Sequence, residues 1–241
     1  MDRTPLARPH VDAEVGAVLF DLDGVLTPTA EVHRRAWHRL FTDYLTERTR
    51  TTGEQLAPYT NTDYYEHVDG KPRLDGVRDL LASRGIALPE AEVEALGARK
   101  NEAFLAELEA GVEPYPGSLA LLEHLATVGT PMAVVSSSAN APAVLRTAGI
   151  DHFFPVVVDG AVAREEGLPG KPAPYTFEAA AERLGVPSDR AVVVEDATSG
   201  VAAGAAGDFA AVVGVDRGAG AEALRAAGAT AVVTDLEELL P

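Results

Sequence analysis

Two aspartates end an apolar run early in the chain, in the segment VLFDLDGV at residues 18–25. Asp21 is the first residue after the run, and Asp23 lies two positions further on, where the sequence turns polar. Like charges this close together raise one another's pKa values unless a cation joins them. The pair therefore points to chemistry that uses a cation, a proton, or both.

Other polar residues follow Val-rich runs further along the chain. Ser136 ends PMAVVS, Lys171 lies in the loop after FFPVVV, and AVVVE ends in Glu195, with Asp196 next. In an open α/β sheet, ligands bind outside the carboxyl ends of the strands. These segments therefore predict one site that combines carboxylates, a hydroxyl and an ammonium group.

The kinds of side chain in this site favour phosphoryl transfer. Oxygen ligands without Cys or His suit the hard cation Mg²⁺, and a lysine and a serine beside a cation suit an anion with several oxygens, phosphate being the common case. Asp21 could attack phosphorus and form an aspartyl phosphate. Asp23 could then protonate the leaving oxygen.

Short apolar strands that alternate with helical stretches would position these residues. Continuous Val-rich runs separated by helical spacing predict an α/β fold with a parallel sheet that is covered on both faces. The runs lie at residues 15–20, 131–136, 153–158, 191–195, 210–215 and 230–233. Residues 29–112 interrupt this rhythm, because they contain amphipathic helical patterns and no convincing strand.

This pattern predicts two domains. We expect a Rossmann-like catalytic core over residues 15–28 and 113–241, with an α-helical cap inserted over residues 29–112. Residues 1–14 are expected to form a flexible tail.

Composition limits the possible partners and compartment. A net charge of −17 and a pI near 4.7 argue against nucleic acid and anionic membranes as partners. The absence of cysteine excludes disulfides, thiolate metal sites and a Cys nucleophile. No signal peptide or membrane span is recognised, so we expect a cytoplasmic enzyme. The single cap and short loops fit a monomer.

Four motifs, taken in order, are similar to those of the haloacid dehalogenase superfamily of aspartate-nucleophile phosphotransferases. They are DLDGV with Asp21 and Asp23, VVSSS with Ser136, GKPAP with Lys171, and VVVEDATSG with Glu195 and Asp196. A helical insertion after the first strand resembles the subclass I arrangement of that superfamily. The resemblance covers nearly the whole chain after the tail.

Within the superfamily, the chain most resembles the β-phosphoglucomutases. The likeness rests on DLDGVLTPTAEVHRRAW, VDGKPR, ARKNEAF and SSSAN. It implies substrate or phosphate contacts for His33, Arg73, Lys100, Asn101, Ser138 and Asn140. His33 could instead only pack against Trp37, and Arg73 and Lys100 could be solvated charges on the cap.

The resemblance also implies a role for each core residue. Asp21 would be the nucleophile and Asp23 the general acid/base, while Ser136 and Lys171 would bind and neutralise the transferring phosphoryl group. The implied Mg²⁺ ligands are Asp21, the main-chain carbonyl of Asp23, Glu195 and Asp196. The implied reaction converts β-glucose 1-phosphate into glucose 6-phosphate, with Arg73 and Lys100 holding the phosphate that is not reacting.

The sequence departs from the mutase pattern at three positions. Pro28 replaces an acidic residue, Ala139 stands where a lysine is common, and Tyr175 replaces a frequent aspartate. A sugar-phosphate phosphatase shares every core residue and remains an alternative. A phosphorylated receiver domain is disfavoured because its acceptor lies on a middle strand, and dehalogenation is disfavoured because it needs no second aspartate.

Overall fold

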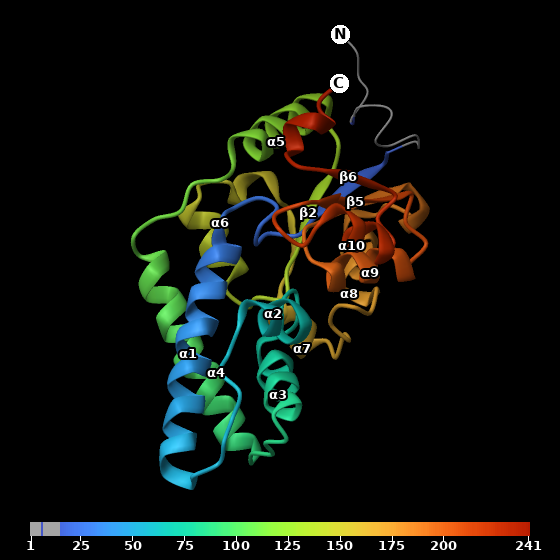
Figure 1. Ribbon diagram of the computed structural model, residues 1–241. Helices are drawn as coiled ribbons and strands as arrows, with labels where there is room; N and C mark the ends of the chain where they lie inside the picture. Colours follow the sequence, from blue (N-terminus) through green and yellow to red (C-terminus); the bar gives the residue numbers. More distant parts are fainter. Residues whose placement is uncertain (1–5, 7–14) are drawn as a thin grey trace. The chain divides into compact units, whose positions relative to one another are not determined.

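The computed structural model describes residue 6 and residues 15–241. The expected flexible tail lies outside these residues, apart from Leu6, whose side chain is buried. The described chain forms two compact units (Figure 1). One contains the chain up to Thr29 together with Val112–Pro241, which we call the α/β unit; the other is Ala30–Gly111, the helical unit.

The α/β unit is built on one six-stranded sheet in which all neighbouring strands are parallel. In spatial order the strands are β3 (Val156–Val158), β2 (Met132–Val135), β1 (Ala17–Phe20), β4 (Ala191–Glu195), β5 (Ala211–Val215) and β6 (Ala231–Val233). The predicted parallel α/β fold is thus confirmed. The strand order reverses at β1, and such a switch point is where ligands bind in sheets of this kind.

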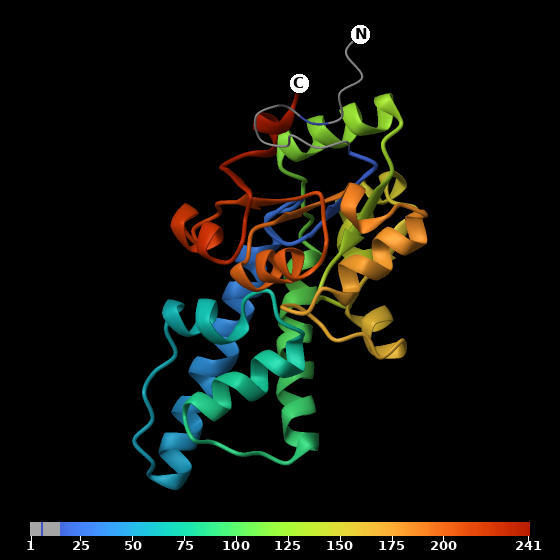
Figure 2. The same cartoon turned by 90° about the vertical axis from the view of Figure 1, so that its right-hand side faces the viewer.

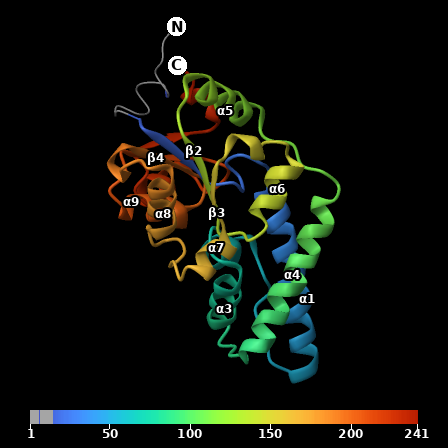
Figure 3. The same ribbon diagram turned by 180° about the vertical axis from the view of Figure 1, so that it is seen from behind.

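Alternate residues of the strands pack on opposite faces, as the two-residue period of a strand requires. Leu19 and Val193 belong to a core shared with three helices, α8 (Tyr175–Leu184), α9 (Thr198–Ala206) and α10 (Ala221–Ala226). Figures 1 and 3 show α5 (Pro116–Val128) and α6 (Ala141–Thr147) apart from these helices, across the sheet. Burial on both faces explains why the strands read as continuous apolar runs.

Most strands are one or two residues shorter than their apolar runs, and β3 is only half as long as its run. The run at residues 153–158 contributes only Val156–Val158, because Phe153 closes the short 3₁₀ helix η2 (Asp151–Phe153) and Pro155 has no N–H to donate. Four short elements complete the unit: α7 (Gly160–Glu165), η3 (Ser188–Arg190), η4 (Leu236–Leu239) and η2.

The helical unit contains the blue-to-green helices of Figure 2. They are α1 (Thr29–Thr52, whose first residue belongs to the α/β unit), α2 (Asn61–Asp63), the π-helix η1 (Tyr64–Val68), α3 (Arg73–Ser83) and α4 (Glu90–Leu108). No strand occurs in residues 29–112, all of which are described, as their helical pattern predicts. The unit has its own core, in which Trp37 and Phe41 stack one helical turn apart with their ring centroids at 5.3 Å.

No helix within the described residues has both the length and the apolar character needed to cross a membrane.

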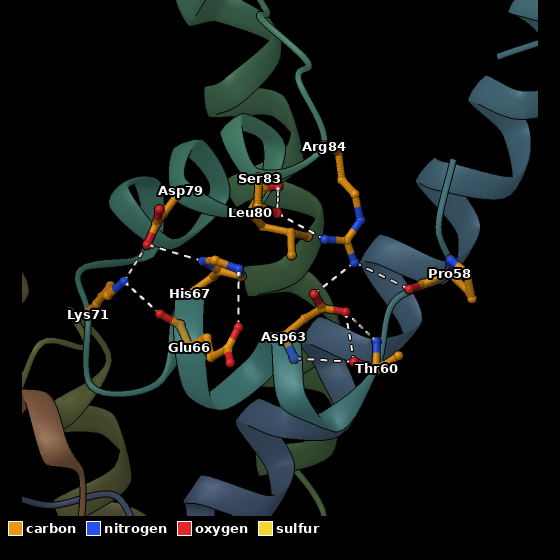
Figure 4. A network of polar contacts seen from close by, with 10 residues as sticks. All are labelled: Pro58, Thr60, Asp63, Glu66, His67, Lys71, Asp79, Leu80, Ser83 and Arg84. Atoms are coloured by element: carbon orange, nitrogen blue, oxygen red, sulfur yellow. Dashed lines mark hydrogen bonds and ion pairs between the residues drawn. The ribbon is translucent and has the colours of Figure 1, made fainter. Parts of the chain in front are cut away.

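A polar network fastens the loop before α2 to the end of α3 (Figure 4). Arg84 donates from Nη2 to Asp63 Oδ1 at 2.7 Å and to the carbonyl of Pro58 at 3.3 Å. The other carboxylate oxygen of Asp63 accepts from the main-chain N of Thr60 at 2.7 Å and from its hydroxyl at 2.9 Å. Nearby, Lys71 forms an ion pair with Asp79 on α3.

The electrostatics of Asp63 follow from these contacts. Burial raises its pKa, but the hydrogen bonds from Arg84 and Thr60 outweigh burial, and the pKa lies below the ordinary value of 3.8. A carboxyl whose pKa is depressed in the folded state stabilises that state above its unfolded pKa, and this stabilisation is lost as the pH falls through the folded pKa.

We predict that Arg84→Met lowers the free energy of unfolding by about 2 kcal/mol at neutral pH, because it leaves a carboxylate with 10% of its side chain exposed without its ion-pair partner. The difference between variant and wild type should shrink below about pH 4, as Asp63 becomes protonated. Urea unfolding across this pH range would measure both effects. Arg99→Ala, at an exposed position of α4, is the control; equal losses in the two variants would contradict the prediction.

Candidate active site

The loop after β1 carries Asp21 and Asp23 in a tight turn. The main-chain N of Asp21 still donates to Val194 on β4 at 2.9 Å, so the strand pairing continues to the aspartate. The carbonyl of Leu22 then accepts from the amides of Leu26 and Thr27. Gly24 has a φ of +93°, which favours glycine. The turn therefore brings both aspartates to the carboxyl end of the central strand.

Lys171 lies between two carboxylates at this end of the sheet. Its Nζ donates to Asp21 Oδ1 at 2.6 Å, to Glu195 Oε1 at 2.5 Å and to the carbonyl of Val135 at 3.1 Å. All three donor and acceptor side chains are almost fully buried. One ammonium group thus joins the ends of β1, β2 and β4, as the sequence motifs predict.

Burial and charge act together on this cluster. Burial raises the pKa of Asp21 well above its ordinary value; Lys171 opposes that effect, while the carboxylates of Glu195 and Asp23 add to it. Burial lowers the pKa of Lys171, but Asp21 and Glu195 outweigh burial and raise it. Lys171 is therefore a cation, and the two carboxyl groups that it contacts are those of Asp21 and Glu195.

Asp23 is oriented by hydroxyl groups. Its Oδ1 accepts from the hydroxyl of Thr29 at 2.5 Å, and Thr29 is in turn 2.7 Å from the hydroxyl of Thr27. Ser136, directly after β2, donates to the other oxygen of Asp23 at a longer 3.4 Å. Asp23 therefore lies beside the predicted phosphate-binding serine, with its side chain held from the start of α1.

The loop after β2 is shaped by its own hydroxyl groups. Ser136 Oγ accepts from the amide of Ser138 at 3.1 Å, and Ser138 Oγ accepts from the amide of Asn140 at 3.2 Å. Gly160 packs against this loop so closely that a Cβ there would lie 2.4 Å from the carbonyl of Ser137. The three predicted contact residues Ser136, Ser138 and Asn140 thus share one constrained loop of the α/β unit.

Glu195 has contacts besides that with Lys171. Its Oε2 accepts from the amide of Ala197 at 2.9 Å, and a Cβ on Gly200 would lie only 1.8 Å from Oε1. Glycine at this position of α9 lets the carboxylate lie against the helix. Asp196, the next residue, is half-buried at the same strand end.

The remaining predicted contact residues belong to the helical unit. Lys100 on α4 is buried, contacts His33 Nδ1, and lies 5.2 Å from the Trp37 ring and 4.9 Å from the Phe104 ring. His33 stacks on Phe104 with centroids 4.1 Å apart. His33 thus packs on an aromatic ring, that of Phe104, and contacts Lys100, while its predicted contact with substrate stays a prediction.

Arg73 and Asn101 lie elsewhere in the same unit. Arg73 begins α3, and its aliphatic stem approaches Gly97 of α4, while Asn101 follows Lys100 and is half-buried. Lys100 is not a solvated surface charge, since its side chain is buried among rings. The substrate roles of the four helical-unit residues remain predictions.

Residues 15–208 match the model of the haloacid dehalogenase-like hydrolase family. The chain belongs to this family. It is an enzyme of the haloacid dehalogenase superfamily, and the recognition made from the four sequence motifs is confirmed.

Individual relatives show which members of the family the chain is similar to. This family member is 50% identical to a beta-phosphoglucomutase of Mycobacterium bovis, over 94% of its own length and 92% of the relative's. It is 32% identical to hexitol phosphatase A of Escherichia coli, over 78% and 77% of the two chains. The crystal structure of beta-phosphoglucomutase from Clostridium difficile superposes with a TM-score of 0.78 at 25% identity, covering 94% and 93%.

The fit of Mg²⁺ to this hydrolase-family site can be judged from its donors. Among residues 6 and 15–241, no three His, Cys, Asp or Glu side chains are grouped as a ready metal site. The predicted set, however, consists of oxygen atoms only: the main-chain carbonyl of Asp23 and the carboxyl groups of Asp21, Glu195 and Asp196. These donors fit a hard cation in kind.

Two residues that contribute to the site, Thr29 and Gly200, have no predicted role in the sequence analysis. Thr29 stood in the resemblance without a function, and Gly200 was not considered. The signal for Gly200 was available, since a glycine five residues after Glu195 in EDATSG lies in the first turn of the next helix. The Thr29 contact had no comparable signal, because a hydroxyl six residues from Asp23 could point anywhere.

We predict that Gly200→Ala keeps the fold but lowers turnover by about 100-fold, because the new methyl group displaces Glu195 from its position beside Lys171. Alanine itself favours a helix. Steady-state kinetics and circular dichroism would measure the two effects. Ala206→Ser, at an exposed position of the same helix, is the control; a fully active Gly200→Ala would mean that Glu195 need not hold this position.

Proposed function

We propose that this enzyme is a β-phosphoglucomutase that works through an aspartyl phosphate on Asp21. The observation that carries the proposal is the contact of Lys171 with Asp21 and Glu195 at the switch point of the sheet. This arrangement supports a buried carboxylate nucleophile beside a cation that receives an anionic substrate. The half-identical mycobacterial relative supports the choice of sugar phosphate.

In the proposed cycle, phosphorylated Asp21 first gives its phosphoryl group to the 6-hydroxyl of β-glucose 1-phosphate. The bond between phosphorus and the Asp21 oxygen breaks, and Asp23 takes the hydroxyl proton. The bisphosphate then presents its other end. Asp21 attacks the phosphorus at C1, Asp23 returns the proton to the departing oxygen, and glucose 6-phosphate leaves. Each half-reaction therefore uses the same two aspartates.

The other core residues would bind and orient the phosphate. The hydroxyl of Ser136 and the ammonium of Lys171 would contact the oxygens of the transferring group, whose charge they offset. The hydroxyl of Thr29 would keep Asp23 aimed at the sugar oxygen, as its 2.5 Å contact with Asp23 suggests. In the helical unit, Arg73 and Lys100 would bind the phosphate that is not reacting.

Mg²⁺ is part of the proposal. Asp21, the carbonyl of Asp23, Glu195 and Asp196 would hold it, and when bound it would offset negative charge on the transferring phosphoryl group.

A sugar-phosphate phosphatase is the second candidate. It would use the same aspartates, with water accepting the phosphoryl group from Asp21. The hexitol phosphatase relative favours it, as does Ala139, which leaves the phosphate loop without the lysine that is common in mutases.

A phosphorus NMR time course with β-glucose 1-phosphate, Mg²⁺ and a trace of glucose 1,6-bisphosphate tests the proposal. We expect conversion into glucose 6-phosphate without release of inorganic phosphate. Asp21→Asn should lower the rate at least about 1,000-fold with the fold retained. Steady release of inorganic phosphate would replace the mutase by the phosphatase, and an active Asp21→Asn would refute the nucleophile assignment.

Metal binding can be tested without turnover. We predict that Mg²⁺ raises the thermal unfolding midpoint of the wild type. At a Mg²⁺ concentration of about 100 times the dissociation constant, the free energy of unfolding should increase by about 2.7 kcal/mol. Asp196→Asn should abolish this shift, whereas Asp208→Asn, at an exposed position, should keep it. A shift that survives Asp196→Asn unchanged would exclude Asp196 as a ligand.

A further inference from the structure

The loop that carries Asp23 is held by its main-chain carbonyls as well as by its own turn. Directly after Asp23, the carbonyl of Gly24 accepts a hydrogen bond from Nε of Arg217 at 3.0 Å. Arg217 lies beyond β5, in a segment that the proposed reaction does not use. This contact therefore links the general acid/base loop to a distant part of the α/β unit.

The next two main-chain carbonyls of the loop also accept hydrogen bonds. The carbonyl of Val25 accepts from the hydroxyl of Ser118 at 2.7 Å, and that of Leu26 accepts from the main-chain N of Tyr115 at 2.9 Å. Ser118 is fully buried in the first turn of α5. Three consecutive carbonyls are thus bound by three donors from outside the loop.

Arg217 is itself fixed on several sides. Its guanidinium lies 4.0 Å from the centre of the Tyr115 ring, and Nη1 donates to the carbonyl of Thr234 at 3.0 Å. Nη2 lies 3.8 Å from a carboxylate oxygen of Asp235. A planar guanidinium can stack on a ring and donate along its edge at the same time, which a lysine ammonium cannot do.

We propose that Arg217, Tyr115 and Ser118 form a clamp that positions Asp23 for proton transfer, with Arg217 as its central positioning residue. The clamp fixes the main chain directly after Asp23, while Thr29 holds the side chain. A loop held at both levels keeps the carboxyl group within hydrogen-bonding reach of the leaving oxygen, where small displacements are costly. This inference rests on the acid/base role of Asp23 in the proposed function.

A comparison of leaving groups provides the test. A sugar oxygen needs a proton as it leaves, whereas 4-nitrophenolate leaves without one, so a misplaced acid slows the phosphorylation of Asp21 by the first substrate only. The release of 4-nitrophenolate is therefore measured in the first turnover, before water attacks the aspartyl phosphate. We expect Arg217→Lys, Arg217→Met and Ser118→Ala to lower kcat for β-glucose 1-phosphate by about 10- to 100-fold. The first-turnover release of 4-nitrophenolate from 4-nitrophenyl phosphate and the KM values should change little. Arg225→Met, at an exposed position of α10, should leave both substrates unaffected.

The variant Asp23→Asn separates the hypothesis that Asp23 is the general acid/base from the hypothesis that the clamp positions it. It should slow the sugar phosphate more than the aryl phosphate, and more strongly than any clamp variant. Equal losses on both substrates in Asp23→Asn would refute the acid/base role and the clamp with it. A selective Asp23→Asn together with unselective clamp variants would refute the clamp alone. If Arg217→Met does not fold, as judged by its unfolding midpoint, Arg217→Lys and Ser118→Ala decide the question.

Discussion

The α/β unit is centred on one buried charge cluster, in which Lys171 forms ion pairs with both Asp21 and Glu195. Its ammonium group joins the ends of three neighbouring strands, through two carboxylates and the carbonyl of Val135. Removing a charge from water is costly, so each member of such a group requires the others. The strands β1, β2 and β4 must therefore end at the same level, and the parallel register of the sheet provides this.

Glycine residues leave the space that this buried charge cluster and its neighbours occupy. Gly200 leaves space for Glu195, and Gly160 lets α7 approach the loop after β2. Gly204 has a similar role in the core, where a Cβ would lie 3.1 Å from both Val193 and Val212. The glycines therefore shape the site as much as the charged side chains do, because a close-packed interior leaves no spare volume for an added Cβ.

The sequence was sufficient to predict the fold class and to place Asp21, Lys171 and Glu195 in one site, but not the ion pairs of Lys171 with the two carboxylates. Val-rich runs specify buried parallel strands, and the carboxyl ends of such strands meet at one edge, so Asp21, Lys171 and Glu195 could be brought together without coordinates. Contacts such as Arg217 with Gly24 could not be predicted in this way. They join a side chain to a main-chain carbonyl distant in sequence, and no pattern of residue types records which carbonyl an arginine reaches. The predicted length of β3 was wrong because Pro155 has no N–H to donate, so the strand begins only after it although the preceding residues are apolar.

The central position of β1 has a consequence for the order in which the chain can fold. Its partners are Met132 and its neighbours on one side and Ala191 and its neighbours on the other. On the ribosome, the helical unit is therefore complete, with its own apolar core, before either partner of β1 has been synthesised. Until then the nascent chain carries an unpaired apolar strand directly before Asp21, the proposed nucleophile, and such long-range pairing is slow to form. The strand before Asp21 is thus made before the helical unit but is paired after it.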